Sequence, residues 1–337
     1  MTTVDIAIFA HNEAAGIGAM VTRLAEQDIL GQPDLTVRMI VLANGCRDAT
    51  VATALAASRA RISVVDLAEP GKSRTWNRFV QSISRSEADI LVFCDADIEF
   101  CNKSTLQLLV RGLIARPELW VLNSRPIKDI VARPQENTRQ DRLIAAAGGG
   151  LDDWKTAICG QLYAMPADKA RRFRLPVGLP VEDGFLRAMV LTDALTGPED
   201  FSRIDGHDTV SHIYASERRI LSLLRHQTRI VIGSAINVCC FRALRDLPLA
   251  DRHAELKRAM VNDRWLPEVM RRELPAAPYG YVPIHFLTKR LSRHFTNRRD
   301  RFRPKPLALA LLGTGFDAVV YLRAQLAMAR GVGAGFW

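Results

Sequence analysis

The stretch Ile90-Leu91-Val92-Phe93-Cys94-Asp95-Ala96-Asp97 joins a continuous apolar run to two carboxylates that are separated by one residue. An uninterrupted apolar run of this length is typical of a strand that is covered on both faces of a parallel sheet. Ligands of such sheets bind beyond the carboxyl ends of the strands. The two carboxylates are therefore expected at an edge of the sheet where a ligand binds.

Three earlier apolar runs, at residues 4–10, 37–43 and 62–67, predict three more strands. Between the four runs, apolar residues recur at the helical spacing of three and four over residues 14–27, 49–59 and 73–84. Strands that alternate with helices build a parallel sheet through right-handed crossovers. The sequence therefore predicts an α/β fold with a doubly wound, mostly parallel sheet.

The rest of the chain is less regular. Residues 125–140 contain two Arg-Pro steps and predict an irregular loop, because the residue before proline disfavours the helical conformation. Residues 157–166 predict another strand, residues 184–192 a short helix that follows Glu182 and Asp183, and residues 217–227 a basic helix.

Length and composition predict one large domain with an extension. The chain has 337 residues, of which 48% are hydrophobic and 24% charged, as in ordinary globular proteins. We expect a domain over residues 1–235, with a nucleotide-binding half at 1–100 and an acceptor half at 101–235, and a helical, basic extension over 236–337 with an apolar tail. The six cysteines lack CxxC spacing and the chain opens on a strand, which predicts a cytoplasmic protein without a secretory signal.

The formal net charge of +10 is concentrated near the C-terminus. Between positions 289 and 305 the sequence has eight Lys and Arg residues and a single acidic residue, Asp300. The apolar tail at residues 307–328 is interrupted by Gly313, Gly315, Asp317 and Arg323, which predicts a helix short of the roughly 20 apolar residues that span a bilayer. A basic run beside an apolar segment favours peripheral binding at the inner face of a membrane. The alternative is an ordinary core helix beside a solvated basic face.

Asp95 and Asp97 supply the hard oxygen ligands that suit Mg²⁺ or Mn²⁺. Acids that follow a strand also cap the next helix, which could begin near Lys103. Both readings are compatible with the position of the triplet.

Five short motifs occur in order along the chain: Ile8-Phe9-Ala10-His11-Asn12-Glu13, Ala43-Asn44-Gly45-Cys46-Arg47-Asp48-Ala49-Thr50, Gly71-Lys72-Ser73 with Asn77, Asp95-Ala96-Asp97, and Val181-Glu182-Asp183. Together they resemble glycosyltransferase family 2 over about residues 4–233. The resemblance implies the GT-A fold, an inverting glycosyltransferase of the hexosyltransferase type that uses a nucleotide-sugar donor, and a Mg²⁺ or Mn²⁺ cofactor.

The resemblance also implies a role for each matching residue. Asp183 would be the catalytic base for the acceptor hydroxyl, and Glu182 would lie on the acceptor side. Asp97, together with Asp95, would hold the metal. The donor would be bound by Ala10, Asn12, Glu13, Asn44, Lys72, Asp95 and Arg229. Two alternatives stay open: acids at a helix N-terminus also interact with its free amides, and Arg229 could belong to a solvated basic face.

Two departures from the family pattern concern the donor and the product. Asn44 stands where the commonest pattern has an acid that pairs with uracil, so a UDP-sugar is favoured without being fixed. The late QxxRW motif is incomplete, because His226 replaces Gln and Ile230 replaces Trp. This predicts a non-processive enzyme that adds one sugar. Neither His11 nor His212 is predicted to be a metal ligand, since a lone histidine is more often a packed or surface residue.

The apolar, basic tail favours a glycan or lipid-linked acceptor and a role in polysaccharide or glycolipid biosynthesis. A sugar-phosphate nucleotidyltransferase is the enzymatic alternative, although Gly16 and Gly18 are sparse for its phosphate loop. A non-catalytic basic module that binds membranes or nucleic acid is the other alternative. No nucleic-acid partner is expected, because the basic run lacks interleaved aromatic residues.

Overall fold

The computed structural model describes residues 1–58, 60–138, 141–142, 153–275, 280–296 and 303–331. An eight-stranded sheet, in the order β3-β2-β1-β4-β7-β6-β8-β5, forms its centre. The strands are β1 Thr2–Ala10, β2 Leu35–Asn44, β3 Ile62–Leu67, β4 Ile90–Asp95, β5 Ile98–Phe100, β6 Val121–Lys128, β7 Leu162–Pro166 and β8 Ile204–Tyr214. The helices are α1 Ile17–Ala25, α2 Thr50–Ala57, α3 Lys72–Arg78, α4 Thr105–Ile114, α5 Asp129–Ala132, α7 Ala167–Ala170, α8 Glu182–Leu191, α9 Ile220–Arg245, α10 Leu249–Ala259, α11 Trp265–Glu273, α12 His285–Thr296 and α13 Pro304–Ala329.

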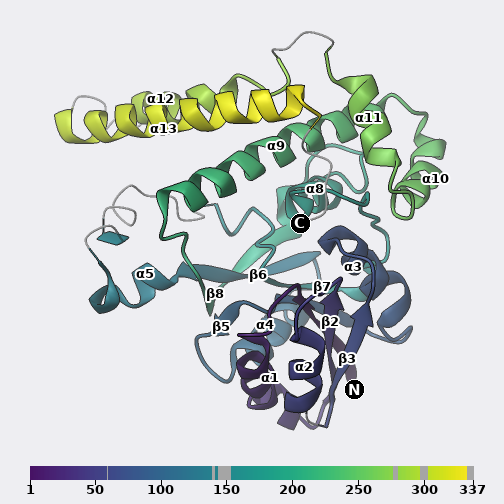
Figure 1. Ribbon diagram of the computed structural model, residues 1–337. Helices are drawn as coiled ribbons and strands as arrows, with labels where there is room; N and C mark the ends of the chain where they lie inside the picture. The colour runs from purple at the N-terminus through teal and green to yellow at the C-terminus, as the bar shows by residue number, and fades with distance from the viewer. Residues whose placement is uncertain (59, 139–140, 143–152, 276–279, 297–302, 332–337) are drawn as a thin grey trace.

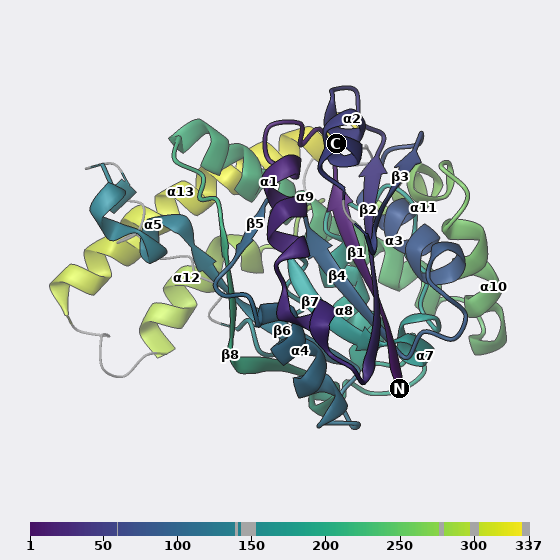
Figure 2. The ribbon, with the colours of Figure 1, turned by 90° about the horizontal axis from the view of Figure 1, so that it is seen from below.

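The four predicted N-terminal strands are confirmed. Strands β3, β2, β1 and β4 lie side by side and run parallel (Figure 2). The second half of the sheet is mixed, since β7 is antiparallel to β4 and β6, and β5 is antiparallel to β8. The predicted α/β fold with a doubly wound, mostly parallel sheet is therefore confirmed, and the antiparallel pairs lie in the second half of the sheet.

Both faces of the sheet are covered, which explains the continuous apolar strands. Ile6 and Ile8 of β1 pack on one face with residues of α1 and α4. Ala7 and Phe9 point to the other face, which is buried by α3, α8 and α9. Asp5 is fully buried in β1 and is neutralised by Arg38 and Arg85.

The predicted irregular loop at residues 125–140 is wrong where the structure describes it. Strand β6 continues through Pro126 to Lys128, α5 follows, and a 3₁₀ turn forms at Pro134–Glu136. On one side, strand β6 pairs with β8 before and after an irregularity between Asn123 and Arg125, whereas on its other side it pairs with β7 only at Leu122 and Asn123. Proline, which lacks an N–H donor, is tolerated there because one side of the strand needs no ladder bond. Gln140 lies outside the described residues.

The predicted strand at 157–166 is confined to β7, and the predicted helix at 184–192 is α8, which begins at Glu182. The basic helix predicted at 217–227 is much longer, because its apolar residues continue: Ile232, Ala235, Ile236 and Cys240 are buried along α9. Residue 235, the expected end of the first domain, lies within this helix. The division of the chain there stays a prediction.

The C-terminal helices form a layer beside the sheet domain. Helix α13 packs along α9, and α12 packs against α13 (Figure 1). Among the described helices, α13 is the one that is long and apolar enough to cross a membrane by length and composition, over Pro306–Ala329 with mean hydropathy 1.5.

The prediction that interruptions leave this segment short of spanning length is therefore wrong. Gly313 and Gly315 continue the helix, and the Asp317 charge is paired with Arg290 at 2.8 Å. Only 17% of the apolar window is buried, which does not fit a core helix. Of the predicted basic run, Arg298, Arg299 and Arg301 lie outside the described residues.

Candidate active site

The polar residues predicted from strand ends gather at one edge of the sheet. The register pairs Ala10 with Ala43, Asn44 with Leu67, and Phe9 with Asp95, so β1 to β4 end at the same level. The loops that follow these strands carry the predicted donor and metal residues. The carboxyl ends of parallel strands thus form the site, as the topology requires.

The loop after β1 is locked to the loop after β2. Asn12 adopts a left-handed conformation with φ 56°, and its Oδ1 accepts a hydrogen bond from the Arg47 amide at 2.8 Å. His11 Nδ1 donates to the Asn44 carbonyl oxygen at 2.6 Å. The amide of Glu13 donates to Thr50 Oγ1 at 2.7 Å. These contacts fix the predicted donor residues before any ligand binds.

Asn44 lies at the end of β2, and its side chain is 4% exposed. Its Oδ1 atom is buried and has no hydrogen-bond partner within the described part of the chain. A buried amide oxygen without a donor is costly, so this atom is a candidate acceptor for a ligand N–H group.

Acidic residues meet at the tips of β1 and β4. Burial raises the pKa of Glu13, and the negative charges of Asp97 and Asp48 raise it further. Two hard carboxylates, Asp95 and Asp97, face this edge with Glu13 nearby. Among the described residues, no group of three or more His, Cys, Asp or Glu side chains has the geometry to hold a metal ion. Asp95 and Asp97 could therefore hold Mg²⁺ or Mn²⁺ only with oxygens from a ligand or water, which is how Mg²⁺ is commonly held.

Lys72 brings the two acidic motifs together. Its Nζ atom lies 2.7 Å from Asp95 Oδ1 and 3.4 Å from Glu182 Oε1, and it donates to the Gly160 carbonyl oxygen at 3.1 Å. The lysine begins α3, directly after Gly71 with φ 125°. The structure thus places Lys72, Asp95 and Glu182 in one cluster, although they are far apart in the sequence.

Glu182 and Asp183 occupy the first turn of α8. Asp183 Oδ1 accepts a hydrogen bond from the Gly184 amide at 2.7 Å, as expected of an acid at a helix N-terminus. Burial raises the pKa of Asp183, and the charge of Glu182 raises it further, whereas Lys72 and Arg229 oppose the shift. A buried carboxyl with a raised pKa is the environment that general bases require.

Helix α9 supports this turn from behind. Asn237 Nδ2 donates to the Val181 carbonyl oxygen at 2.9 Å. A Cβ at Gly233 would lie 2.4 Å from Val181 Cγ2, so only glycine lets α9 approach this closely. The charge of Arg229 acts on Asp183, which places this predicted donor residue on the Asp183 side of the site.

Sequence reasoning missed Gly160 and Gln161, which precede β7. The Gln161 carbonyl oxygen accepts a hydrogen bond from the Asp95 amide at 2.8 Å. Gln161 Oε1 also accepts from Nε2 of His212, which is fully buried. Burial lowers the pKa of His212 to about 3, so this histidine is a neutral packing residue behind the site. No local pattern in the sequence marks these residues.

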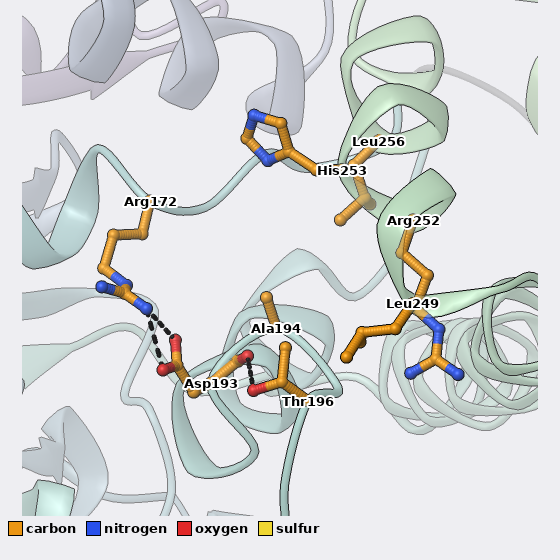
Figure 3. Close-up of a pocket in the computed structure, with 8 residues that line it drawn as sticks. All are labelled: Arg172, Asp193, Ala194, Thr196, Leu249, Arg252, His253 and Leu256. Carbon is orange, nitrogen blue, oxygen red and sulfur yellow. Dashed lines mark hydrogen bonds and ion pairs between the residues drawn. The ribbon is translucent and has the colours of Figure 1, made fainter.

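A pocket of about 290 Å³ lies at the other end of α8 (Figure 3). It is lined by Arg172, Asp193, Ala194, Thr196, Leu249, Arg252, His253 and Leu256. Arg172 Nη2 lies 2.7 Å from Asp193 Oδ1, so these two charges neutralise each other across the pocket. None of the predicted site residues lines it, and the candidate active site is the cluster at the strand ends.

A family model described as Glycosyl transferase family 2 matches residues 5–189, more than half of the chain. The chain belongs to glycosyl transferase family 2. No curated protein matches it. The family 2 assignment and the enzyme class predicted from the motifs are confirmed, and this family 2 protein is a glycosyltransferase.

Solved structures with low sequence identity resemble this chain. A mannosyltransferase from Pyrobaculum calidifontis in complex with GDP-Man and Mn²⁺ has a TM-score of 0.53 and 17% identity, over 95% of this chain and 86% of that chain. Glucosyl-3-phosphoglycerate synthase from Mycobacterium tuberculosis, in complex with Mn²⁺, UDP-glucose and phosphoglyceric acid, has a TM-score of 0.48 and 21% identity, over 70% of this chain and 79% of that chain. The family match together with the mannosyltransferase structure shows the predicted GT-A fold, and the family 2 chain also has a C-terminal helical region.

Proposed function

We propose that this family 2 enzyme transfers one sugar, with inversion, from a nucleotide-diphosphate sugar to an acceptor hydroxyl. The observation that carries the proposal is the cluster in which one ammonium group, Lys72 Nζ, lies 2.7 Å from Asp95 and 3.4 Å from Glu182. Through Lys72, this cluster brings Asp95, which would bind the donor, close to Glu182, which would lie on the acceptor side. A donor bound at the strand ends would thus present its anomeric carbon towards Asp183.

Asp183 is the proposed catalytic base. It would accept the proton of the acceptor hydroxyl while the hydroxyl oxygen bonds to the anomeric carbon, and the bond from that carbon to the diphosphate oxygen breaks. Attack from the face opposite the leaving diphosphate inverts the configuration. The raised pKa of Asp183 supports this role, since a base with a pKa nearer the working pH accepts a proton more readily. Glu182, on the same turn, would orient the acceptor.

Asp95 and Asp97 are the proposed ligands of Mg²⁺ or Mn²⁺. Their oxygens fit such an ion. The pKa of Glu13 is raised first by burial and then by the charges of Asp97 and Asp48, so Asp97 lies close to another carboxyl at this edge. When bound, the ion would stabilise the charge of the departing diphosphate. The Pyrobaculum mannosyltransferase is described in complex with Mn²⁺, which agrees with this choice.

The proposed donor-binding residues follow the strand ends: Ala10, Asn12, Glu13, Asn44, Lys72 and Asp95, with Arg229 on the Asp183 side. The unpartnered Asn44 Oδ1 would accept an N–H of the nucleobase. Both N3–H of uracil and N1–H of guanine offer that donor. A UDP-sugar is the favoured donor, and a GDP-sugar is the alternative that the same atom allows.

The acceptor that we propose is a glycan or a lipid-linked glycan, in polysaccharide or glycolipid biosynthesis. The enzyme would act in the cytoplasm, peripherally at the inner face of the membrane. Support comes from α13, an apolar helix of which only 17% is buried over its most apolar window. We also propose that residues 1–235 form the catalytic domain, with nucleotide-binding and acceptor halves at 1–100 and 101–235, and that residues 236–337 form an extension.

The test is nucleotide release from UDP-, GDP- and dTDP-sugars, with Mn²⁺, with Mg²⁺ and with chelator. Wild type is compared with Asp97→Ala, Asp183→Asn and Asp168→Asn, the last being an exposed acid outside the site. We expect one donor to turn over with metal, loss of turnover in the first two variants, and unchanged nucleotide binding in Asp183→Asn. The product anomer, read by NMR, reports inversion. Metal-independent turnover, or full activity of Asp183→Asn, would contradict the assigned roles.

A further inference from the structure

The outward side of α13 is an apolar stripe that no other described element covers. Its residues recur at intervals of three and four, which places them on one side of a helix. They are Ala308, Leu311, Leu312, Gly315, Val319, Leu322, Leu326 and Ala329, and we call them the outer face of α13. At 1.5 Å per residue the face is roughly 30 Å long.

The exposure of this face is large for apolar side chains. Leu312 is 74% exposed, and Leu311, Leu322 and Leu326 are each more than half exposed. A contiguous exposed apolar surface marks an interaction site, whereas single exposed leucines are ordinary.

The opposite side of α13 is firmly fixed to the rest of the protein. Val320, Ala324 and Met328 are buried there. Gln325 is also buried; its Oε1 accepts a hydrogen bond from the Tyr281 amide at 3.0 Å, and its Nε2 donates to the Val282 carbonyl oxygen at 3.2 Å. The rotation of α13 is thus set by contacts with the segment before α12, and the outer face cannot turn inward without breaking them.

Charge identifies the occupant of the face. Asp317 is the sole acidic residue between positions 303 and 331 in the sequence, and its side chain points inward to Arg290 at 2.8 Å. Arg323 is exposed on the same helix, Arg330 is exposed directly after the helix ends, and Lys289 and Arg293 are exposed on α12. The surface presented outward is therefore apolar and cationic without a carboxylate of α13. This combination is complementary to an anionic lipid surface, where apolar side chains enter the interface and cations remain at the headgroups.

We infer that the protein docks on anionic lipid through the outer face of α13, with the helix lying in the plane of the membrane. An orientation across the bilayer would remove the helix from α9 and carry Asp317 into hydrocarbon, away from Arg290. The inference deepens the proposed membrane association and rests on it, but it depends on none of the catalytic assignments.

Docking in this orientation brings the active site near the lipid. Helix α9 lies between α13 and α8 (Figure 1). Its Asn237 holds the turn that carries Glu182 and Asp183 through the Val181 carbonyl oxygen. An α-helix with its side chains is about 10–12 Å across, so the two helix layers α13 and α9, roughly 20–24 Å together, separate the lipid surface from the proposed acceptor side. The glycan of a lipid-linked acceptor would extend over this distance to the site while its lipid stays in the membrane.

The test is vesicle flotation of the full chain with phosphatidylcholine vesicles, with and without phosphatidylglycerol, at low and high salt. The variant is Leu312→Glu/Leu322→Glu, which changes two exposed side chains of the outer face. The control is Leu55→Glu/Val261→Glu, which changes two equally exposed apolar side chains elsewhere (57% and 67%). We expect wild type and control to bind anionic vesicles, more weakly at high salt, and the variant to bind at least about tenfold more weakly. Nucleotide binding should be the same in all three proteins.

Each other outcome overturns a distinct statement. If the variant floats as wild type does, the outer face of α13 is not the docking surface. If wild type binds no vesicles, the proposed membrane association fails together with this inference, while donor turnover still tests the transferase. If light scattering instead shows a wild-type dimer that the variant converts to a monomer, without vesicle binding by either, a second copy of this chain covers the face.

Discussion

Lys72 and Asp95 form an ion pair in which Nζ lies 2.7 Å from Oδ1 and 2.8 Å from Oδ2. Burial alone lowers the pKa of Lys72, but the charges of Asp95 and Glu182 outweigh burial and raise it. The lysine is therefore protonated. In the same pair, burial raises the pKa of Asp95, and the ammonium of Lys72 opposes that shift. One ammonium group thus lies between the carboxyl groups of both acidic motifs.

Lys72→Met should destabilise the protein. The side chains of Lys72 and Asp95 are 22% and 19% exposed, so removal of the ammonium leaves poorly solvated carboxylates without a partner. Charged hydrogen bonds of this kind contribute about 1.5–3 kcal/mol, and we expect the free energy of unfolding to fall by about 2 kcal/mol in urea at pH 7. Lys103→Met, which removes an exposed pair with Glu26, is the matched control and should unfold close to the wild-type midpoint. Equal midpoints for Lys72→Met and wild type would mean that the cluster is not held by this charge.

The parallel half of the fold was predictable because its strands are buried on both faces, and such strands have apolar residues at successive positions. Strand β6 was not, because two Arg-Pro steps indicate a loop locally, whereas the missing partner of β6 beyond Asn123 makes proline acceptable in the strand. The prediction that Asp317 interrupts the apolar helix is wrong for a similar reason, since its charge is neutralised by Arg290, 27 residues earlier. Such compensation depends on tertiary contacts and leaves no local pattern.

The candidate site also has features that the sequence predicts and others that depend on tertiary contacts. Asn44 and Asp95 end strands, and Glu13 and Asp97 come shortly after strands, so their place at one edge was predictable once the register aligns the strand ends. The contacts of Lys72 with Gly160 and Glu182 were not, because they arise from the antiparallel pairing of β7 with β4 and from the packing of α8. The sequence therefore predicted the position of these residues at the edge but not the link between the two acidic motifs, and the roles of the residues stay predictions.

The acid limb of the pH–rate profile should respond to the charges around Asp183. A base acts only when deprotonated, so activity is lost as the pH falls through its pKa. The charge of Glu182 raises the pKa of Asp183, and the charge of Lys72 lowers it. Glu182→Gln should therefore move the acid limb to lower pH, and Lys72→Met should move it to higher pH. The measurement is kcat/KM of each protein between pH 4.5 and 9, and shifts of the two variants in the same direction would exclude Asp183 as the titrating base.

Gly160→Ala should impair turnover through Asp183. A Cβ at position 160 would lie 3.2 Å from Asp183 Oδ2 and 3.3 Å from Asp183 Cβ, so the carboxyl must move by a few tenths of an ångström. Misplacement of about 1 Å costs about a hundredfold in rate, and we expect kcat to fall by about tenfold or more. Gly31→Ala, whose added Cβ meets nothing within 4 Å, serves as the control.

Nucleotide binding and the unfolding midpoint of Gly160→Ala should stay close to wild type, which separates a displaced base from a damaged fold. If kcat is unchanged while Asp183→Asn is inactive, the carboxyl tolerates the displacement, and positioning by Gly160 is refuted.

Asp5 tests the fold independently of the site. Its side chain is fully buried at the amino end of β1, where Oδ2 lies 2.6 Å from Arg38 Nη2 and Oδ1 accepts from Arg85 Nε at 2.8 Å. Asp5→Ala would leave two guanidinium groups without their anion. Removal of one partner of a fully buried pair costs about 3–5 kcal/mol, and the lower end of that range is expected here because Arg38 and Arg85 are 35% and 21% exposed. Because total stabilities are about 5–15 kcal/mol, this change should lower the thermal midpoint strongly.

Asp34→Ala, which breaks an exposed pair with Arg111, should leave the midpoint near wild type. Since Asp5 lies at the opposite end of β1 from Ala10, the folded fraction of Asp5→Ala should keep the wild-type kcat at low temperature. A loss of kcat without a loss of stability would show that this end of the strand also positions the donor site.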